Sequence, residues 1–339
     1  MKGCIRKAHG FGGALSQELL DELIYPALTE SETPEHRVTE DAAVFTLPPG
    51  PCAFSTDSFT VKPVFFPGGD IGKLAVAGTV NDLAVSGAEP AVLSLALMIE
   101  EGFSLEDLRR IIRSAGRTCR EAGVRVVTGD TKVVERGSLD GIFINTAAIG
   151  TVRFPNMGPA ALREGDSILI SGTVGDHGAA ILSARENLGS GLDLASDCAP
   201  LNGMIRGVLG EWGSAVHAMR DPTRGGLAAV LNEFADDSGF EIILREPDIP
   251  IRPGVRDFLD ILGMDPLLLA NEGKIILFCT PDAEQGVLDT LKRHPLGRES
   301  AVIGTVAGTR DSGRVLLETG LGTKRILNMP LEPGMPRIC

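Results

Sequence analysis

The sequence is poor in aromatic residues and contains no long apolar run. Phe, Trp and Tyr make up 4% of its 339 residues while hydrophobic residues make up 43%, so aliphatic side chains must form most of the core. No segment approaches the roughly 18–20 uninterrupted apolar residues of a membrane-spanning helix. The N-terminal segment has basic residues but neither an apolar stretch nor a cleavage site, so we expect no signal peptide. We therefore expect a globular cytoplasmic protein that does not bind membranes.

Positive charge is scarce as well. The chain has 32 Lys and Arg against 45 Asp and Glu, which gives a formal net charge of −13. A nucleic-acid-binding surface needs a basic stripe, so we expect no nucleic-acid partner. If such a protein binds an anionic ligand, it must do so through a bound cation or through local backbone amides.

The cysteines are few and far apart. None of the six forms a Cys-x-x-Cys pair and no His lies at metal-ligand spacing, so a zinc site is not expected. In a chain of this length without a secretory signal, the thiols are expected to be reduced. We expect Cys52, Cys119, Cys198 and Cys279 to be buried, in contrast to Cys4 and the C-terminal Cys339.

Three familiar motifs are also absent. No Gly-x-Gly-x-x-Gly follows a predicted strand, which leaves a dinucleotide-binding fold without support, and there is no Gly-x-Ser-x-Gly elbow of a hydrolase. The segment 68–74 resembles a phosphate-binding P-loop only superficially, because its spacing is one residue short and Leu74 stands where Ser or Thr is required.

The length and the pattern of elements predict two α/β domains. A chain of 339 residues is past the size at which one core keeps growing, and strand-like and helix-like segments alternate, which indicates an α/β or α+β fold. The segment 151–159 loses periodicity and gathers Pro and Gly, so we divide the chain into domains 1–153 and 154–326 and a tail, 327–339. Predicted helices cover 15–24, 70–87, 104–122, 179–187, 227–237 and 283–293; predicted strands cover 42–47, 52–56, 91–99, 124–128, 142–149, 167–171, 241–244, 274–280, 301–306 and 314–318.

Acidic residues recur beside the predicted strands of the first half. Asp41 precedes one strand, Asp57 ends the next, Asp82 lies in the small-residue helix and Asp130 follows a third strand. Converging carboxylates repel each other without a cation, and Mg²⁺ bridging carboxylates to phosphate oxygens would relieve that repulsion. Any single Asp at a strand end is also explained by ordinary turn chemistry. The group as a whole leaves a magnesium–nucleotide site and turn chemistry as alternatives.

The two ends of the chain carry further candidates. Gly10, Gly12 and Gly13 precede the first helix and could present backbone amides to phosphate, although a flexible arm has the same composition. The last ten residues contain three prolines, which favour an extended arm that ends in the thiol of Cys339. An unstructured end with an incidental cysteine is the alternative.

The ending Pro336-Arg337-Ile338-Cys339 resembles the C-terminal signature of the HypE family of hydrogenase maturation factors, which are carbamoyl dehydratases. The resemblance extends in order over essentially the whole chain. The similar blocks are 9–13, 55–58, 65–74, 79–82, 127–134, 172–178, 221–226 and 270–274. Their glycine-rich and Asp motifs resemble the wider PurM-like superfamily of aminoimidazole ribonucleotide synthetase, whereas the terminal cysteine specifies this family.

The resemblance implies a fold, an activity and a set of partners. The fold would be PurM-like, with an N-terminal domain whose sheet pairs with that of a second copy in a homodimer. A carbamoyltransferase of the HypF type would load a carboxamide onto Cys339, ATP with Mg²⁺ would drive its dehydration to a cyanide, and an iron scaffold of the HypC–HypD type would accept the cyanide. A small-molecule kinase of the same superfamily is the alternative function, and a carrier without catalysis is a third possibility.

The resemblance also assigns roles to residues. Cys339 carries the substrate, Glu272 is the base, with His177 next in order, and Lys132 stabilises phosphate or the carboxamide oxygen. Asp57, Asp82, Asp130 and, more weakly, Asp41 would bind the metal. The expected nucleotide-binding residues are Gly10, Gly12, Gly13, Lys62, Lys73, Asn81, Thr128 and Gly129. His217 is expected to be structural, and Arg224 either contacts phosphate or supports packing.

Overall fold

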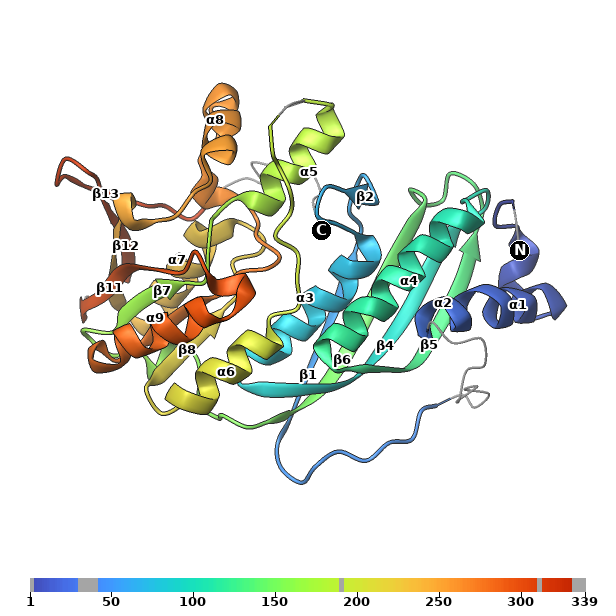
Figure 1. Ribbon diagram of the computed structural model, residues 1–339, viewed down its shortest axis with the longest axis horizontal. Coiled ribbons are helices and arrows are strands. Elements are labelled where there is room, and N and C mark those ends of the chain that lie inside the picture. Colours follow the sequence, from blue (N-terminus) through green and yellow to red (C-terminus); the bar gives the residue numbers. More distant parts are fainter. Residues whose placement is uncertain (1–2, 30–41, 189–191, 310–312, 331–339) are drawn as a thin grey trace.

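The computed structural model describes residues 3–29, 42–188, 192–309 and 313–330. Within these residues the chain forms two separate sheets and one small hairpin (Figure 1). The order of the four-stranded sheet is β1-β6-β4-β5, and that of the seven-stranded sheet is β13-β12-β9-β11-β7-β10-β8. The expectation of a mixed α/β fold is confirmed. No helix in the described ranges is long and apolar enough to cross a membrane.

The first sheet is covered by helices on one face. Its strands are β1 (Cys52–Phe59), β4 (Ala88–Glu100), β5 (Arg125–Val134) and β6 (Ile142–Val152). Figure 1 shows α3 (Ile71–Val85) and α4 (Leu105–Ala122) lying across this sheet. Alternate residues on the opposite face stay partly exposed, and Phe54 is 66% exposed. The sheet therefore has one buried and one open face.

The chain begins and enters α3 through short elements. The 3-10 helix η1 (Lys7–Gly10), α1 (Ala14–Leu19), the π-helical turn η2 (Leu20–Ile24) and α2 (Tyr25–Thr29) come first, and β2 (Phe65–Phe66) pairs with β3 (Gly69–Asp70). The carboxylate of Asp70 caps α3 by accepting hydrogen bonds from Gly72 N and Lys73 N, at 2.8 and 3.1 Å. Small side chains dominate α3, and most of its residues are buried because it lies between the first sheet, α4 and the second domain.

The second sheet has helices on both faces. Its strands are β7 (Ser167–Ile170), β8 (Val216–Arg220), β9 (Phe240–Arg245), β10 (Ile276–Cys279), β11 (Ala301–Thr309), β12 (Arg314–Glu318) and β13 (Lys324–Ile326). One core cluster joins this sheet to α7 (Gly226–Ser238), and another joins it to α6 (Asn202–Trp212) and α9 (Glu284–Arg293). The remaining helices are α5 (Asp176–Glu186) and α8 (Pro253–Leu262), and the short 3-10 turns are Pro159–Ala161, Glu246–Asp248, Pro266–Leu268, Pro281–Ala283 and Pro295–Gly297.

Several sequence predictions were wrong. Residues 42–47 are irregular rather than a strand. Strands β1 and β5 continue beyond their apolar residues, so Asp57 and Asp130 lie within strands and not at their ends. Ladder hydrogen bonds come from the backbone, so a polar side chain on either face does not end a strand. The expectation that Cys52 is buried was also wrong, because Cys52 lies on the open face of β1 and is exposed.

The sequence analysis also missed helices. Helix α6 contains three glycines, which weaken its helical signal, although its apolar residues Met204, Ile205, Val208 and Leu209 recur at helical spacing. Helix α8 begins at Pro253, a residue that suits the first turn of a helix. The missed strand β8 matters most for function, because it leads directly into Asp221.

Two helical glycines provide a test of the packing. A Cβ at Gly116 in α4 would lie 2.0 Å from the carbonyl oxygen of Leu28, whereas a Cβ at Gly207 in α6 would meet nothing within 4 Å. We expect Gly116→Ala to lower the free energy of unfolding by about 1–3 kcal/mol through overpacking. Gly207→Ala should raise it by about 0.5–1 kcal/mol, because alanine favours the helix. Urea denaturation measures both, and equal effects would contradict this packing of α2 on α4.

Candidate active site

Four acidic side chains from both domains converge on the junction between the two sheets. Asp57 lies on β1 and Asp82 on α3, whereas Asp221 directly follows β8 and Glu272 precedes β10. Burial raises the pKa of Asp82 to about 7, with contributions from the negative charges of Asp221 and Asp57. Burial, followed by the charges of Asp221, Asp197, Asp57 and Asp82, raises the pKa of Glu272 well above its usual range. These carboxyl groups are therefore close enough to hinder one another's ionisation.

Strand register places Asp57 and Asp82 on the same side of the first sheet. Asp57 is opposite Thr146 in the β1–β6 ladder, and the Thr146 hydroxyl lies 2.6 Å from that of Thr79 on α3. The hydroxyl of Ser55 donates a 2.7 Å hydrogen bond to Asp82 Oδ2. Both aspartates thus belong to the side of the sheet that α3 covers.

The donor set suits a magnesium ion that also binds phosphate. Burial, with the charges of neighbouring carboxylates, raises the pKa of Asp82 to about 7 and that of Asp221 to about 6. Carboxylate oxygens are hard ligands, and a divalent cation would relieve the repulsion among them. Among the described residues, no three His, Cys, Asp or Glu side chains are placed to hold a metal by themselves. Proteins commonly hold Mg²⁺ with one or two carboxylates plus substrate phosphates and water, and these residues fit that arrangement.

Asn81, an expected nucleotide-binding residue, has its side chain fully engaged within the chain. Its amide donates hydrogen bonds to the carbonyl oxygens of Ala199 at 3.1 Å and Glu272 at 3.4 Å, and its Oδ1 accepts one from Leu201 N at 2.8 Å. Asn81 is 1% exposed. It therefore fastens α3 to the loops of the second domain and fixes the backbone of Glu272.

Asp130 and Lys132 lie apart from this acidic group. In the β4–β5 ladder Asp130 is opposite Ala96 and Lys132 opposite Met98, whereas the neighbouring Leu95 and Leu97 point into the core. Both side chains thus belong to the open face of the sheet. Strands β1 and β5 are also the two edges of this sheet, and three strand spacings of about 4.8 Å separate them by about 14 Å. Within one chain, a single ion cannot contact both Asp57 and Asp130.

The remaining expected nucleotide residues are spread over four places. Thr128 and Gly129 lie on β5, and Gly10 packs against the same strand, since a Cβ there would lie 2.8 Å from Val133. Gly12 and Gly13 form the exposed turn that follows η1. The Lys62 ammonium pairs with Asp140 at 2.9 Å, and Lys73 donates to the carbonyl of Gly68 at 3.1 Å. Lys73 also lines a cleft of about 690 Å³ with Asp70, Arg110, Arg113 and Arg117.

Two further candidates, the expected metal ligand Asp41 and the terminal Cys339, lie outside the described residues.

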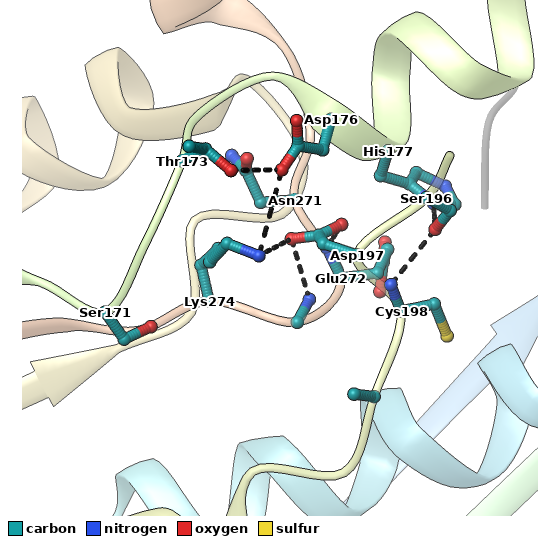
Figure 2. Close-up of polar contacts among 12 residues, drawn as sticks. Ser171, Thr173, Asp176, His177, Ser196, Asp197, Cys198, Asn271, Glu272 and Lys274 are labelled. Carbon is teal, nitrogen blue, oxygen red and sulfur yellow. Dashed lines mark hydrogen bonds and ion pairs between the residues drawn. The ribbon is translucent and has the colours of Figure 1, made fainter. Parts of the chain in front are cut away.

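His177 and His217 are buried in hydrogen-bonded positions. His177 lies in the first turn of α5 rather than in a loop, and its Nδ1 is 2.8 Å from the hydroxyl of Ser196 (Figure 2). His217 Nδ1 lies 2.8 Å from Asp166 Oδ2, in agreement with its expected structural role. Arg224, in the turn before α7, is exposed.

Sequence reasoning did not select Asp221, although a signal for it was present. The rule applied to the first half, a carboxylate directly after a strand, holds for Asp221 once β8 is recognised. Asp197 had no comparable signal, because it lies in the irregular segment between α5 and α6 and is brought to Glu272 only by the fold.

Comparisons with known proteins agree over nearly the full length. The family models "AIR synthase related protein, N-terminal domain" and "AIR synthase related protein, C-terminal domain" match residues 39–152 and 163–316. The carbamoyl dehydratase HypE of Azotobacter vinelandii is 46% identical, over 99% of this chain and 98% of that protein. A crystal structure of HypE in complex with ATP superposes with a TM-score of 0.93 at 44% identity, covering 98% of this chain and 99% of that one. A structure of a HypE–HypF complex gives a TM-score of 0.79 at 48% identity, covering 82% and 90%.

The crowding of carboxylates predicts a pH-dependent cost in stability. The pKa of Asp82 is raised from 3.8 to about 7, so the folded protein holds this proton more tightly than the unfolded chain does. Folding stability therefore falls as pH rises from about 4 to about 7. We expect Asp82→Asn to raise the free energy of unfolding in EDTA by on the order of 2 kcal/mol at pH 8, and by little at pH 4. Urea unfolding at both pH values measures this.

The exposed Asp257 on α8 provides the matched control. Asp257→Asn should give no gain that grows with pH. If Asp82→Asn instead lowers the free energy of unfolding at pH 8, the carboxylate of Asp82 is not destabilised by burial and by its neighbours as the structure indicates.

Proposed function

Because the chain belongs to the HypE family of carbamoyl dehydratases, we propose that it dehydrates a carboxamide carried on the sulfur of Cys339. The product is a thiocyanate on the same sulfur, ATP is consumed, and the cyanide becomes a ligand of the [NiFe] hydrogenase active site. The proposal is supported by full-length identity to carbamoyl dehydratases and by a terminal cysteine at the end of the chain.

One observation carries the chemical part of the proposal. Glu272 is 3% exposed, and its carboxyl group has a strongly raised pKa beside three aspartates suited to a metal–phosphate site. A carboxyl group of this kind is a candidate general base, since its conjugate base binds a proton more tightly than an ordinary carboxylate does. No other described glutamate has a pKa raised by this set of neighbours.

The proposed reaction needs one base, Glu272, and one acceptor for the phosphoryl group, the carboxamide oxygen. The carboxamide oxygen is a poor leaving group, so it takes the γ-phosphoryl group of ATP and departs as phosphate. The carbon–oxygen bond breaks and the carbon–nitrogen bond becomes triple as nitrogen loses its two protons. Glu272 accepts a proton from that nitrogen, and the products are the thiocyanate, ADP, phosphate and one proton released at neutral pH.

We assign nucleotide and metal binding to the aspartates at the junction. One or two of the carboxylates of Asp57, Asp82 and Asp221 would hold Mg²⁺ together with the phosphates and water, and Asp41 is a further expected ligand that lies outside the described residues. Bound Mg²⁺ would neutralise charge on the transferred phosphoryl group. The related HypE structure that contains ATP supports a nucleotide site in this fold.

A homodimer would complete the site. Asp130, Lys132, Thr128 and Gly129 lie on the edge strand β5, on or beside the open face, and cannot reach the acidic group of their own chain. A second copy that pairs across this open face would bring its β5 residues to the first copy. Lys132 would then act on phosphate or on the carboxamide oxygen, and Gly10, which packs on β5, would accompany it with the adjoining Gly12 and Gly13.

We propose two further partners. A HypF-type carbamoyltransferase would load Cys339, and the related HypE–HypF complex supports this assignment. A HypC–HypD-type iron scaffold would accept the cyanide. Both interactions require the tail, residues 327–339, to present Cys339 first to one binding partner and then to another, and to the acidic site in between.

The decisive experiment follows the mass of the tail peptide. After incubation with the carbamoylating partner, ATP and Mg²⁺, the wild-type peptide should carry a cyanide. Glu272→Gln should retain the carboxamide, because only the base is lost. Cys339→Ala should gain neither group and still bind ATP.

Cys52→Ala is the matched control, since Cys52 is also an exposed thiol. It should behave as the wild type does. Thiocyanate formation at the wild-type rate in Glu272→Gln would exclude Glu272 as the base and leave His177 as the next candidate. ATP-dependent phosphorylation of a small molecule by a Cys339→Ala protein would favour the kinase alternative.

The open sheet face predicts the oligomeric state. The wild type should sediment as a dimer at micromolar concentration, and Phe54→Asp should shift it towards the 35.7 kDa monomer by placing a charge on that face. Ile261→Asp, at another exposed apolar position, on α8, should leave the dimer intact. A wild-type protein that stays monomeric would exclude a contribution of β5 from a second copy to the site.

A further inference from the structure

A buried carboxylate outside the acidic group makes contact with the backbone of Glu272. Asp197 lies between α5 and α6, and its Oδ1 and Oδ2 accept hydrogen bonds from the N–H groups of Glu272 and Gly273, each at 3.1 Å (Figure 2). The ammonium group of Lys274 lies 3.2 Å from Asp197 Oδ2. The hydrogen bonds and the ion pair that the Asp197 carboxylate makes with described residues are thus all with the consecutive residues Glu272, Gly273 and Lys274, and Glu272 is the candidate base.

Asp197 is held in its ionised form. Burial raises the pKa of this carboxyl group, but the charges of Lys274 and His177 and the N–H of Glu272 outweigh burial and bring the pKa below its usual range. Lys274 is itself 7% exposed, and its ammonium lies 3.9 Å from Asp176, a second carboxyl group. Its side chain packs on Gly172, where a Cβ would lie 2.9 Å from Lys274 Cε.

The Asp197 loop is fixed from its other side as well. Ser196 Oγ lies 2.8 Å from His177 Nδ1 and accepts a 3.0 Å hydrogen bond from Cys198 N. The backbones of the two loops touch, because a Cβ at Gly273 would lie 1.8 Å from the carbonyl oxygen of Asp197. The backbone of Glu272 is therefore held at its N–H by Asp197 and at its carbonyl by Asn81.

Stability alone does not explain a charged pair in this place. Desolvation of two buried ions offsets most of their attraction, and well-packed apolar residues are often as stable. A charged hydrogen bond to backbone N–H groups does offer a short and directional contact. Such a contact is useful where a catalytic side chain must be held within a fraction of an ångström.

We propose that Asp197, kept ionised by Lys274, is a positioning residue for the dehydration step. It fixes the backbone from which the Glu272 carboxylate reaches the carboxamide nitrogen, and it contacts neither substrate nor nucleotide itself. This inference rests on the proposed role of Glu272 as the base.

The test measures thiocyanate formation in single turnovers of the full-length protein. The thiol of Cys339 is carbamoylated with cyanate in a Cys4→Ser, Cys52→Ser background, which removes the two exposed cysteines of the described chain. ATP and Mg²⁺ are then added over a range of ATP concentrations, and the tail peptide is followed by mass spectrometry. Asp197→Asn should lower the maximal rate on the order of 100-fold and leave the half-saturating ATP concentration unchanged, because only alignment of the base is lost.

A double-mutant cycle separates positioning from a general weakening of the fold. In a Glu272→Gln background, Asp197→Asn should cause no further loss, since a residue that acts through Glu272 has nothing left to position. Asp166→Asn is the matched control, because the side chain of Asp166 is also buried, accepts a hydrogen bond from Arg163 N and pairs with His217. It should leave the maximal rate unchanged.

Each other result overturns the proposal. Additive losses in the cycle, a parallel rise in half-saturating ATP, an equal loss in Asp166→Asn or an unchanged rate in Asp197→Asn would each exclude positioning through Glu272. If Asp197→Asn does not fold, Lys274→Met tests the same ion pair by the same cycle. A fully active Glu272→Gln protein would instead refute the proposed base, which makes the two failures distinguishable.

Discussion

Mutual repulsion among buried carboxyl groups is the constraint on which the rest of this site depends. Asp57 and Asp82 approach the junction from the first sheet and its helix α3, and Asp221 and Glu272 approach it from the second sheet. Burial and the neighbouring charges raise the pKa of Asp82, Asp221 and Glu272. Such an arrangement lowers stability unless a cation or a proton compensates it, so it persists only where the surrounding fold holds it in place.

Three polar side chains hold the junction together. Asn81 joins α3 to the carbonyl of Glu272, and Asp197 joins the α5–α6 segment to the N–H of the same residue. Asn271 accepts a 2.8 Å hydrogen bond from Gly175 N and donates one of 3.1 Å to the carbonyl of Pro222, next to Asp221. Because the side chains of Asn81, Asn271 and Asp197 are buried and hydrogen-bonded, the loops that carry Asp221 and Glu272 are positioned by specific contacts rather than by apolar packing alone.

Local sequence patterns predicted the elements that have strong local signals. Helix α4 begins at the capping Ser104 and ends at Gly123, which has a positive φ of 70°, as expected from the residue types. The same reasoning failed for α6, where glycines mask the apolar repeat, and for the full length of β1 and β5. Strand length there is set by pairing with β6 and β4, which no local pattern reveals.

The candidate site divides in the same way. Asp57 and Asp82 could be selected because they belong to recognisable motifs, and Glu272 through its resemblance to a known family. Asp221 needed the strand β8, and Asp197 needed the three-dimensional fold, since 75 residues separate it from Glu272 along the chain. The position of Asp130 on the opposite face of the sheet follows only from the register of β4 and β5.

The fate of the carboxamide oxygen tests the proposed chemistry most directly. The tail would be carbamoylated with ¹⁸O-labelled cyanate and given ATP and Mg²⁺, and the released phosphate would be analysed by mass spectrometry. If the buried acidic site directs phosphoryl transfer to that oxygen while Glu272 removes a proton from nitrogen, one ¹⁸O atom should appear in phosphate for each thiocyanate formed. Label that appears in water, with unlabelled phosphate, would contradict it.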